Sequence, residues 1–328
     1  MNQQFIDTIL KVTGANNYFE IEIIQSLWSG YGKIVRIGLE GSVHKTLVLK
    51  HVRLPKNENH PRGWNTNLSH NRKIKSYKVE SKFYENYASN LKMAKIPNCL
   101  VIDFFEDEVL IVLEDLDSIG YPARKHAVNW EEIKLCLQWL AYFHATYLNI
   151  SPKGLWEIGT YWHLDTRPEE LEVLDDLQLK EKASAIDMLL NKSTYKTLVH
   201  GDAKLANFCF SEDGKKVAAV DFQYVGGGCG MKDVAYFIGS CLNEEDCEKL
   251  EQQILDYYFE QLKIALAEIG RNNLLKTINF KELEKEWRNL YPVAWTDFHR
   301  FIKGWSPGHW KINSYSERVA KELIKNLS

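Results

Sequence analysis

The chain has 328 residues, enough for two substantial hydrophobic cores or for one body with two lobes. Hydrophobic residues make up 45% of it and charged residues 26%, as in an ordinary soluble globular protein. The formal net charge of −3 argues against long-range attraction to nucleic acid or to an anionic membrane, so neither is expected as a partner.

Cysteine spacing and hydropathy indicate the cellular compartment in which the protein is expected. The six cysteines are scattered and form no C-x-x-C pair, which argues against a zinc site or a secreted disulfide framework and favours reduced thiols. No apolar run approaches the roughly 18 residues of a membrane-spanning helix, and the N-terminal stretch lacks the basic start and cleavage pattern of a signal peptide. We therefore expect a cytoplasmic protein.

The first part of the chain has the pattern of a β-sheet with one helix. Residues Phe19–Val52 are rich in Ile, Val and Leu and are punctuated by glycines, which predicts three antiparallel strands joined by tight turns. A helix is expected over Tyr77–Leu91, and two further strands are expected over Leu100–Leu116, around a turn at Glu106–Glu108. A β-rich region with one helix therefore fits residues 19–115.

A polar stretch, Arg53–Lys78, separates the third strand from that helix. It holds seven Lys and Arg residues against one acidic residue. A solvated loop and a site for RNA or an acidic ligand both fit this composition, and we favour the loop. A steep loss of affinity with salt would be the sign of a nucleic-acid site.

Helices dominate after Leu116. Asn129 followed by Glu132 predicts a capped helix start, and the apolar face of this helix includes His144, which we interpret as a core histidine. Short strands are expected at 196–202 and 216–222, and further helices at 168–190, 244–269, 280–290 (ending before Pro292) and 315–326. The predicted fold class is α+β, with a small antiparallel β lobe at 1–116 and a larger, mainly helical lobe at 117–328.

The stretch from His200 to Asn207 has the pattern of a phosphoryl-transfer loop. Such chemistry needs a carboxylate beside the acceptor hydroxyl, ligands for Mg²⁺, and cations against the phosphates. Asp202 and Asn207 are separated by four residues, as in the H-R-D-x-x-x-x-N loop of kinases, so one loop could aim Asp202 at the acceptor and Asn207 at a metal ion. Lys204 could approach the transferred phosphate or stabilise the loop. Asp221, at the end of an apolar strand, is the expected second metal ligand.

The β-rich region supplies candidates for holding the nucleotide. Lys50 ends the third strand and could reach the α- and β-phosphates, while Glu80 on the following helix could pair with it. Gly30 and Gly32, in Ser29–Gly32, could bring backbone N–H groups close to phosphates, although a hairpin turn also needs glycines. The backbone of Glu114–Leu116 could hydrogen-bond an adenine. Residues 1–116 are therefore predicted to form the nucleotide-binding lobe, and 117–328 the lobe with the catalytic loop and the acceptor site.

These motifs together resemble a known superfamily. The strings that carry the resemblance are "VLK", "KVESKFYENY", "IVLEDL", "LVHGDAKLANF" and "AVDFQ". They resemble the aminoglycoside phosphotransferase and choline kinase superfamily over roughly residues 20–310, and look most like its ecdysteroid-kinase-like branch. The resemblance implies a two-lobed protein-kinase-like fold and ATP- and Mg²⁺-dependent phosphorylation of a small-molecule hydroxyl.

The resemblance also implies roles for single residues. Asp202 would be the catalytic base, Asn207 and Asp221 the Mg²⁺ ligands, and Lys50 and Glu80 the pair that anchors the nucleotide. In "KDVAYFIGSC", the aspartate at position 233 would brace the active-site loop. Two departures from the pattern of protein kinases are the short glycine loop and the glutamine at position 223, which follows Asp-Phe where protein kinases have glycine.

The acceptor and the oligomeric state are not predicted by the sequence. Choline-like amines, amino-sugar antibiotics, sterol-like alcohols and thioribose-like sugars all remain open as acceptors. Trp156, Trp162, Trp295, Trp305 and Trp310 could wall a pocket, but packing in the helical core is the alternative for each one. The polar side chains at 297, 299 and 300 could recognise substrate or lie on a salt-bridged helix surface. A catalytically silent nucleotide-binding or regulatory module is the alternative function, and a protein kinase is disfavoured because no activation segment ending in A-P-E is found.

Overall fold

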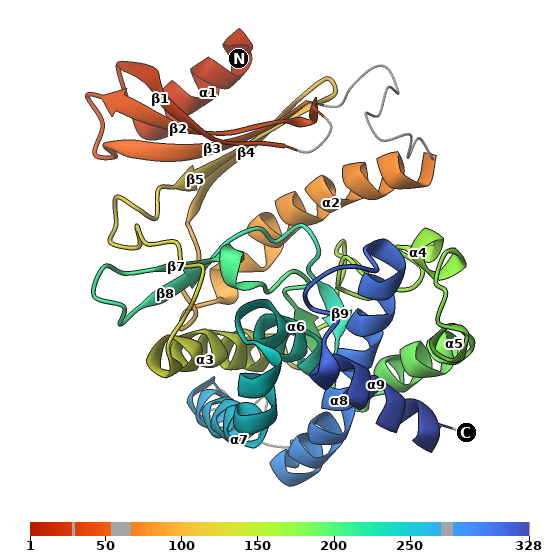
Figure 1. Cartoon of the computed structure of the whole chain (residues 1–328). Coiled ribbons are helices and arrows are strands. Elements are labelled where there is room, and N and C mark those ends of the chain that lie inside the picture. The colour runs from red at the N-terminus through yellow and green to blue at the C-terminus, as the bar shows by residue number, and fades with distance from the viewer. Residues whose placement is uncertain (28–29, 54–66, 270–277, 328) are drawn as a thin grey trace.

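The computed structural model describes residues 1–27, 30–53, 67–269 and 278–327. The N-terminal part contains a five-stranded antiparallel sheet with the order β1-β2-β3-β5-β4. Its strands are β1 (Asn17–Ser26), β2 (Gly32–Glu40), β3 (Thr46–Arg53), β4 (Cys99–Phe105) and β5 (Glu108–Glu114). All five strands were predicted, and the sheet lies at the top of Figure 1, above a mainly helical region.

Helix α1 (Gln3–Thr13) covers one face of this sheet, and it was not predicted. The Asn2 side chain accepts a hydrogen bond from the Phe5 N–H at 2.9 Å and caps its start, while Gly14 with φ 64° ends it. Phe5 and Ile9 are fully buried against apolar side chains of β2, β3 and β5. Because Leu47 and Leu49 face α1, the pleat turns the alternate residues of β3 to the opposite face.

Helix α2 (Asn67–Asn86) begins ten residues before the predicted helix and includes much of the basic stretch. The interpretation of that stretch as a solvated loop is therefore wrong for residues 67–78; residues 54–66 lie outside the described part. Arg72 donates to the Thr166 carbonyl at 2.8 Å and lies 3.5 Å from a Glu169 carboxylate oxygen, so its side chain is committed to the helical region. Tertiary contacts of this kind stabilise the first turns of α2, whose polar sequence does not predict a helix.

The helical region follows the predictions for α3, α7 and α9, and departs from them elsewhere. Its helices are α3 (Trp130–Thr146), α4 (Pro168–Glu172), α5 (Leu177–Asn191), α6 (Met231–Cys241), α7 (Glu244–Ile269), α8 (Phe280–Trp305) and α9 (Ser314–Asn326), with short 3₁₀ turns η2 (Ala88–Asn90) and η3 (Leu205–Asn207). The segment 168–190 is two helices because the Asp176 side chain caps a new start, accepting from the Leu179 N–H at 3.1 Å.

Helix α8 runs through Pro292, where the sequence predicted an end. A proline inside a helix removes one backbone hydrogen bond and costs about 3 kcal/mol. Here its neighbours Tyr291, Val293 and Trp295 are all buried, and this packing outweighs the loss. The predicted helix boundary at residue 290 is therefore wrong, and α8 extends to Trp305.

Short strand pairs carry the loops of the helical region. β6 (Thr197–Val199) pairs with β9 (Gly226–Gly228), and β7 (Phe208–Phe210) pairs with β8 (Val217–Ala219). The strands β7 and β9 were not predicted, because three-residue strands give no clear alternation in sequence. The two pairs fix both ends of the segment from His200 to Asn207.

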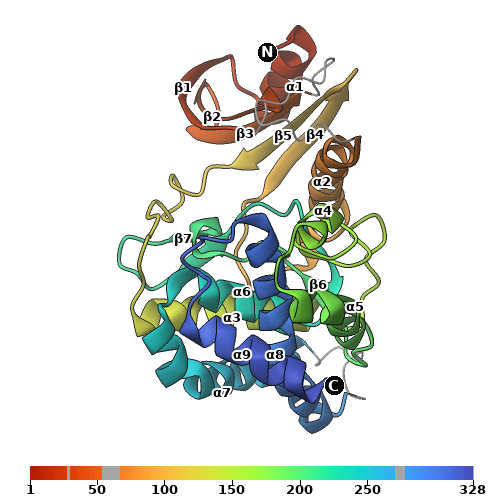
Figure 2. The ribbon, with the colours of Figure 1, turned by 45° about the vertical axis from the view of Figure 1, so that its right-hand side comes forward.

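Helix α2 connects the sheet to the helices, as Figures 1 and 2 show. Tyr77 packs with Val52 beneath the sheet, whereas Phe83 stacks on Phe222, with ring centroids 4.2 Å apart, inside the large core of the helical region. The division of the chain at residue 116 stays a prediction. Among the described residues, no helix combines the length and the apolar character needed to cross a lipid bilayer.

Candidate active site

Lys50 and Glu80 form a buried ion pair between β3 and α2. Lys50 lies on the face of β3 opposite α1, between Ile34 of β2 and Ile111 of β5. Its ammonium lies 2.6 Å from a Glu80 carboxylate oxygen, and the two residues are 3% and 1% exposed. A charged pair buried this deeply is costly unless further partners satisfy it. A further charged partner of Lys50 is Asp221, which lies much later in the sequence.

Asp221 brings the helical region to this pair. Its Oδ1 lies 3.3 Å from the Lys50 ammonium and accepts a hydrogen bond from Gln223 Nε2 at 2.6 Å. The residue follows β8 with φ 71°, in the left-handed region that aspartate tolerates better than most residues. Phe222, fully buried between α2 and the helical core, holds this bend in place.

Asp233 fixes the start of the loop that follows β6, residues 200–207. Its carboxylate accepts hydrogen bonds from the His200 N–H at 2.5 Å and the Gly201 N–H at 3.0 Å, and lies 3.1 Å from His144 Nε2. His144 is fully buried and also contacts the Tyr258 hydroxyl, so it is a core histidine as predicted. Because Asp233 is fully buried at the start of α6, it contacts the loop from the side that faces the core.

Asp202, Lys204 and Asn207 form one hydrogen-bonded group. Asp202 Oδ2 accepts from Lys204 Nζ at 3.0 Å and from Asn207 Nδ2 at 3.1 Å, and Asn207 also donates to the Asp202 carbonyl at 2.7 Å. Asp202 Oδ1 is buried, and the Tyr236 hydroxyl lies within hydrogen-bonding reach of this carboxylate. Oδ2 is thus held by two donors, and Oδ1 keeps capacity for a ligand.

Cations set the ionisation of the site. Burial by itself would lower the pKa of Lys50, but Glu80 and Asp221 raise it above its usual value, so this amine stays charged. Burial opposes ionisation of Asp221 as well, but Lys50 and Lys204 bring its pKa well below the usual range. Lys204 in turn has a raised pKa, because Asp202 and Asp221 outweigh its burial.

Two side chains near this group, Lys73 and Gln223, were not assigned a role from the sequence. Lys73 of α2 is half-buried; burial lowers its pKa, while Asp221 and Asp202 raise it. Gln223 donates to Asp221 and accepts from Ser76 of α2, so it connects the metal-ligand candidate to that helix. Lys73 lies in the basic stretch, where no local pattern separates it from its neighbours.

The glycine turn and the segment after β5 flank the same region. Gly30 has φ 76° and Gly32 has φ 129°, and a Cβ on Gly32 would lie 2.0 Å from the His51 carbonyl oxygen, so the turn itself requires both glycines. Ser29 lies outside the described residues. Glu114 is engaged by Lys95 at 2.7 Å. The Leu116 carbonyl accepts from the Tyr121 N–H at 2.9 Å, whereas no described residue accepts from the Leu116 N–H.

The predicted tryptophans separate into two groups. Trp156, Trp162 and Trp295 are buried in the core, whereas Trp305 and Trp310 are 43% and 58% exposed.

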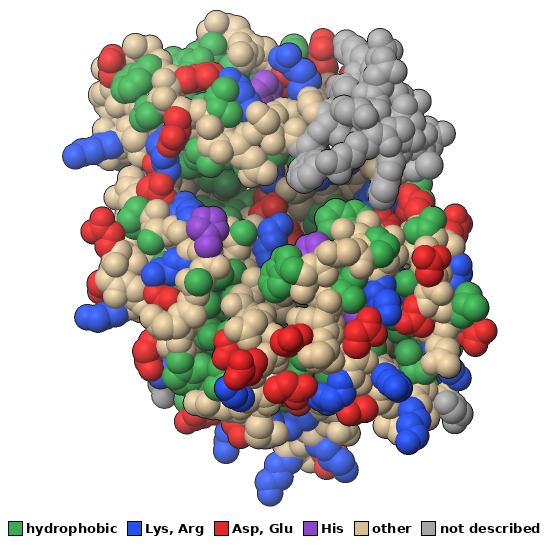
Figure 3. Space-filling view, in the orientation of Figure 1, with side chains coloured by type: hydrophobic (Ala, Val, Ile, Leu, Met, Phe, Trp, Pro, Cys, Tyr) green, Lys and Arg blue, Asp and Glu red, His purple; other side chains and the backbone are tan. Residues whose placement is uncertain are grey.

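The three polar residues predicted at 297, 299 and 300 lie on α8 and are buried. They are therefore neither substrate ligands at a surface nor part of a salt-bridged helix surface. Asp297 and Arg300 form a buried pair at 2.9 Å that also binds Trp162, and His299 is 1% exposed beside Glu317. Seen from outside, the molecule is hollowed between the sheet and the helices (Figure 3).

Solved structures with this fold include small-molecule kinases. Plasmodium vivax ethanolamine kinase is 15% identical, with 94% of this chain and 82% of that chain covered and a TM-score of 0.50. An aminoglycoside phosphotransferase from Streptomyces rimosus, solved with ADP and streptomycin, is 12% identical, with 89% and 98% covered and a TM-score of 0.47. At 15% identity, the likeness to the ethanolamine kinase establishes the kinase-like fold and nothing more. No curated protein matched the chain.

The family follows from the sequence itself. The model of the ecdysteroid kinase-like family matches residues 33–153 and 160–271, which together make up more than half of the chain and include Lys50, Glu80, Asp202, Asn207 and Asp221. Five residues that meet in the fold therefore all lie within the matched segments. The chain belongs to the ecdysteroid kinase-like family, and it shares the fold of an ethanolamine kinase.

Proposed function

We propose that this protein is an ATP- and Mg²⁺-dependent phosphotransferase that moves the γ-phosphate to a hydroxyl group of a small molecule. The observation that supports it best is the meeting of Lys50 with Asp221, 171 positions apart, at 3.3 Å. Asp202 and Asn207 share one hydrogen-bonded loop on the same side of the molecule. Family membership supports the same reaction class.

Residues of the N-terminal region would bind the nucleotide. Lys50, kept charged by Glu80, would contact the phosphates, and the turn at Gly30 and Gly32 would approach them from the sheet. The Leu116 N–H is a donor without a partner among the described residues, which suits an adenine ring nitrogen. Without such a ligand, the N–H of this buried residue would have no hydrogen-bond acceptor.

Asp221 and Asn207 fit a magnesium ion. Mg²⁺ prefers carboxylate and amide oxygens and completes its shell with phosphate and water oxygens. The low pKa of Asp221 keeps that carboxylate ionised, and Asn207 donates through its amide nitrogen to Asp202, which leaves its amide oxygen as the ligand. When bound, the ion would neutralise charge on the phosphates.

Asp202 would accept the proton of the acceptor. Its Oδ2 is held by Lys204 and Asn207, so its Oδ1 could receive the hydroxyl proton while the acceptor oxygen forms a bond to the γ-phosphorus. The bond between that phosphorus and the bridging oxygen breaks, and ADP leaves with the electron pair. Lys204, charged and half-exposed, would stabilise the charge on the transferred group.

The test compares the wild type with Asp202→Ala, with Asp7→Ala on the exposed face of α1 as the control. ADP formation with ATP and Mg²⁺ is followed over a panel of hydroxyl acceptors, and ATP affinity is measured by calorimetry. We expect Asp202→Ala to lower transfer by about 10²-fold or more while changing ATP affinity little. Unchanged transfer in this variant would refute the role of Asp202. ATP binding by the wild type without transfer to any acceptor would favour a silent nucleotide-binding module.

A further inference from the structure

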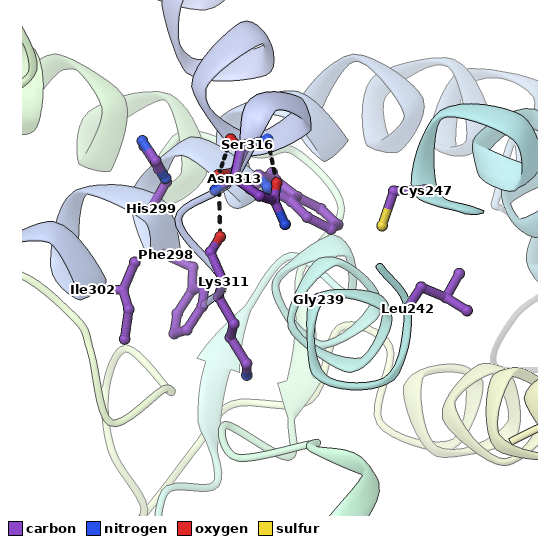
Figure 4. Close-up of a pocket in the computed structure, with 10 residues that line it drawn as sticks. Gly239, Leu242, Cys247, Phe298, His299, Ile302, Lys311, Asn313 and Ser316 are labelled. Atoms are coloured by element: carbon purple, nitrogen blue, oxygen red, sulfur yellow. Dashed lines mark hydrogen bonds between the residues drawn. The ribbon is translucent and has the colours of Figure 1, made fainter. Parts of the chain in front are cut away.

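Lys311 lies in the connection between α8 and α9, and its backbone is fixed from both sides. Its N–H donates to His309 Nδ1 at 3.1 Å, and its carbonyl accepts from Ser316 Oγ at 3.1 Å. Ser316 belongs to the capping box that starts α9 at Asn313. Figure 4 shows the side chain leaving this cap and extending beside Phe298. The position of this amine is therefore set by the fold.

The ammonium of Lys311 has aromatic neighbours, and no carboxylate of the described residues forms an ion pair with it. It lies 4.7 Å from the centre of the Tyr236 ring, 5.2 Å from that of Phe298 and 5.6 Å from that of Trp310. Among the described residues, no hydrogen bond or ion pair to its Nζ occurs within the usual distances. Aromatic faces attract a cation, but they replace only part of its hydration. A half-buried amine among aromatic rings has capacity for an anionic or hydrogen-bond-accepting oxygen.

Tyr236 connects Lys311 to Asp202, because the centre of its ring lies 4.7 Å from the Lys311 ammonium and its hydroxyl lies within hydrogen-bonding reach of the Asp202 carboxylate. Burial lowers its pKa to about 8, Asp202 raises it and Lys204 lowers it further. Asp221, by contrast, responds to Lys50, Lys204 and Lys73. Lys73 and Lys204 therefore act on both carboxylates, whereas Lys50 acts on Asp221 and Lys311 acts on the carboxylate that would receive the acceptor proton.

Tyr236 and Tyr161 extend this side of the site. The Tyr161 and Tyr236 hydroxyls lie 3.1 Å apart, and the pKa of each is raised by burial with Asp202 as a further cause. Both hydroxyls are therefore neutral donors near the same carboxylate. An acceptor that reaches Asp202 from here would meet one cation, two hydroxyls and aromatic rings.

We propose that Lys311 selects the charge class of the acceptor: it favours a hydroxyl compound that carries an anionic group near the reacting hydroxyl, and it disfavours one that carries a cation there. This inference rests on the proposed function, since it assigns the substrate class of the same site. Lys311 lies beyond residue 271, where the match to the family model ends, so this feature belongs to the chain and not to the family motif. An acceptor cation would be placed beside a fixed, poorly hydrated ammonium, and repulsion between like charges is strongest where water is excluded.

The experiment uses acceptors that differ in charge and little else. Choline, 3,3-dimethylbutan-1-ol and isethionate share a hydroxyethyl group that ends in a cationic, a neutral and an anionic tetrahedral centre, respectively. A second, aromatic series consists of 4-(hydroxymethyl)benzylamine, 4-methylbenzyl alcohol and 4-(hydroxymethyl)benzoate. Binding of each compound to the full-length protein loaded with ADP and Mg²⁺ is measured by saturation-transfer NMR, which needs no turnover.

Wild type is compared with Lys311→Met and Lys311→Glu, and Lys321→Glu, an exposed position on α9, serves as the matched control. We expect the wild type and the control to bind the anion at least tenfold more tightly than the cation in at least one series. Lys311→Met should reduce this ratio at least tenfold, and Lys311→Glu should invert it. Equal ratios in all four proteins, or a preference of the wild type for the cations, would overturn the proposal.

Two further measurements distinguish this inference from a role of Lys311 toward the transferred phosphate and from a failure of the nucleotide site. If Lys311→Met weakens binding of a non-hydrolysable ATP analogue more than binding of ADP, with an unchanged acceptor ratio, the amine serves the transferred phosphate and the acceptor assignment is wrong. ADP binding is measured in every protein, because its absence from the wild type would refute the nucleotide site itself. The acceptor ratio is a binding property, so a charge preference without turnover would support charge selection by Lys311 while favouring the silent nucleotide-binding module over the transferase.

Discussion

Gly201 occupies a position in the loop after β6 that tolerates no side chain. Its φ is 80°, and a Cβ would lie 2.1 Å from the Tyr224 carbonyl oxygen and 2.8 Å from the Thr160 nitrogen. The left-handed conformation costs a non-glycine residue about 1–2 kcal/mol, and a contact of 2.1 Å with backbone requires the loop to move as well.

We therefore expect Gly201→Ala to lower the free energy of unfolding by about 3 kcal/mol or more, as measured by urea denaturation. Gly120→Ala is the matched control: Gly120 has φ 96°, but a Cβ there would meet no atom within 4 Å, so this variant carries the cost of backbone strain alone. A cost at Gly201 equal to that at Gly120 would contradict the close approach to Tyr224.

Single residues in and around the candidate site differ in whether the sequence alone could identify them. Asp202 and Asn207 could be recognised because their spacing is local and one short loop brings them together. Lys73 and Lys311 could not, since the surroundings of each are formed by elements distant in sequence, such as the Tyr236 ring beside Lys311. A lysine side chain has no periodicity of its own, and only tertiary structure distinguishes it from a solvated one.

The packing of α8 against α9 contains a histidine that should make stability depend on pH. Burial lowers the pKa of His299 to about 4, against the opposing effect of Glu317, while Lys303 lowers it and Asp176 raises it. An unfolded histidine has a pKa of about 6.5. Between these values the unfolded chain binds more protons than the folded one, so the free energy of unfolding falls as the pH is lowered from about 6.5 to about 4.

We expect this histidine to account for roughly 2–3 kcal/mol of the loss on acidification. His299→Gln, which does not titrate, should show a correspondingly shallower decline in denaturant-derived stability from pH 7 to pH 4. His126→Gln, at an exposed position, controls for removal of a histidine. Parallel profiles for the wild type and His299→Gln would show that His299 is not kept neutral by burial.

Elements were predictable where local signals were strong. The capping box of α3, with Asn129 and Glu132, and the five strands of the sheet follow directly from pattern. Helix α8 was predicted too short because Pro292 is an unfavourable helix residue by itself, and α2 because its first turns are polar. In both cases tertiary packing overrides local preference.

For the whole molecule, the decisive feature is that one helix belongs to two cores. Helix α2 packs against the sheet through Tyr77 and against the helical region through Phe83, and its Glu80 pairs with Lys50 while Gln223 reaches it through Ser76. The sequence suggested the fold only through its resemblance to a superfamily. Composition and periodicity predicted the elements, but the contacts that join them are long-range and leave no local pattern.

The central claim is that Asp221 and its neighbours form a magnesium-dependent nucleotide site, and the most direct test is the affinity for ADP with and without Mg²⁺. Asparagine tolerates the left-handed backbone of this position, so Asp221→Asn removes the charge with little strain. By calorimetry, Mg²⁺ should raise the ADP affinity of the wild type and of Asp7→Asn at least tenfold, and should leave that of Asp221→Asn nearly unchanged. An ADP affinity of the wild type that is the same with and without Mg²⁺, or an undiminished Mg²⁺ effect in Asp221→Asn, would contradict this account.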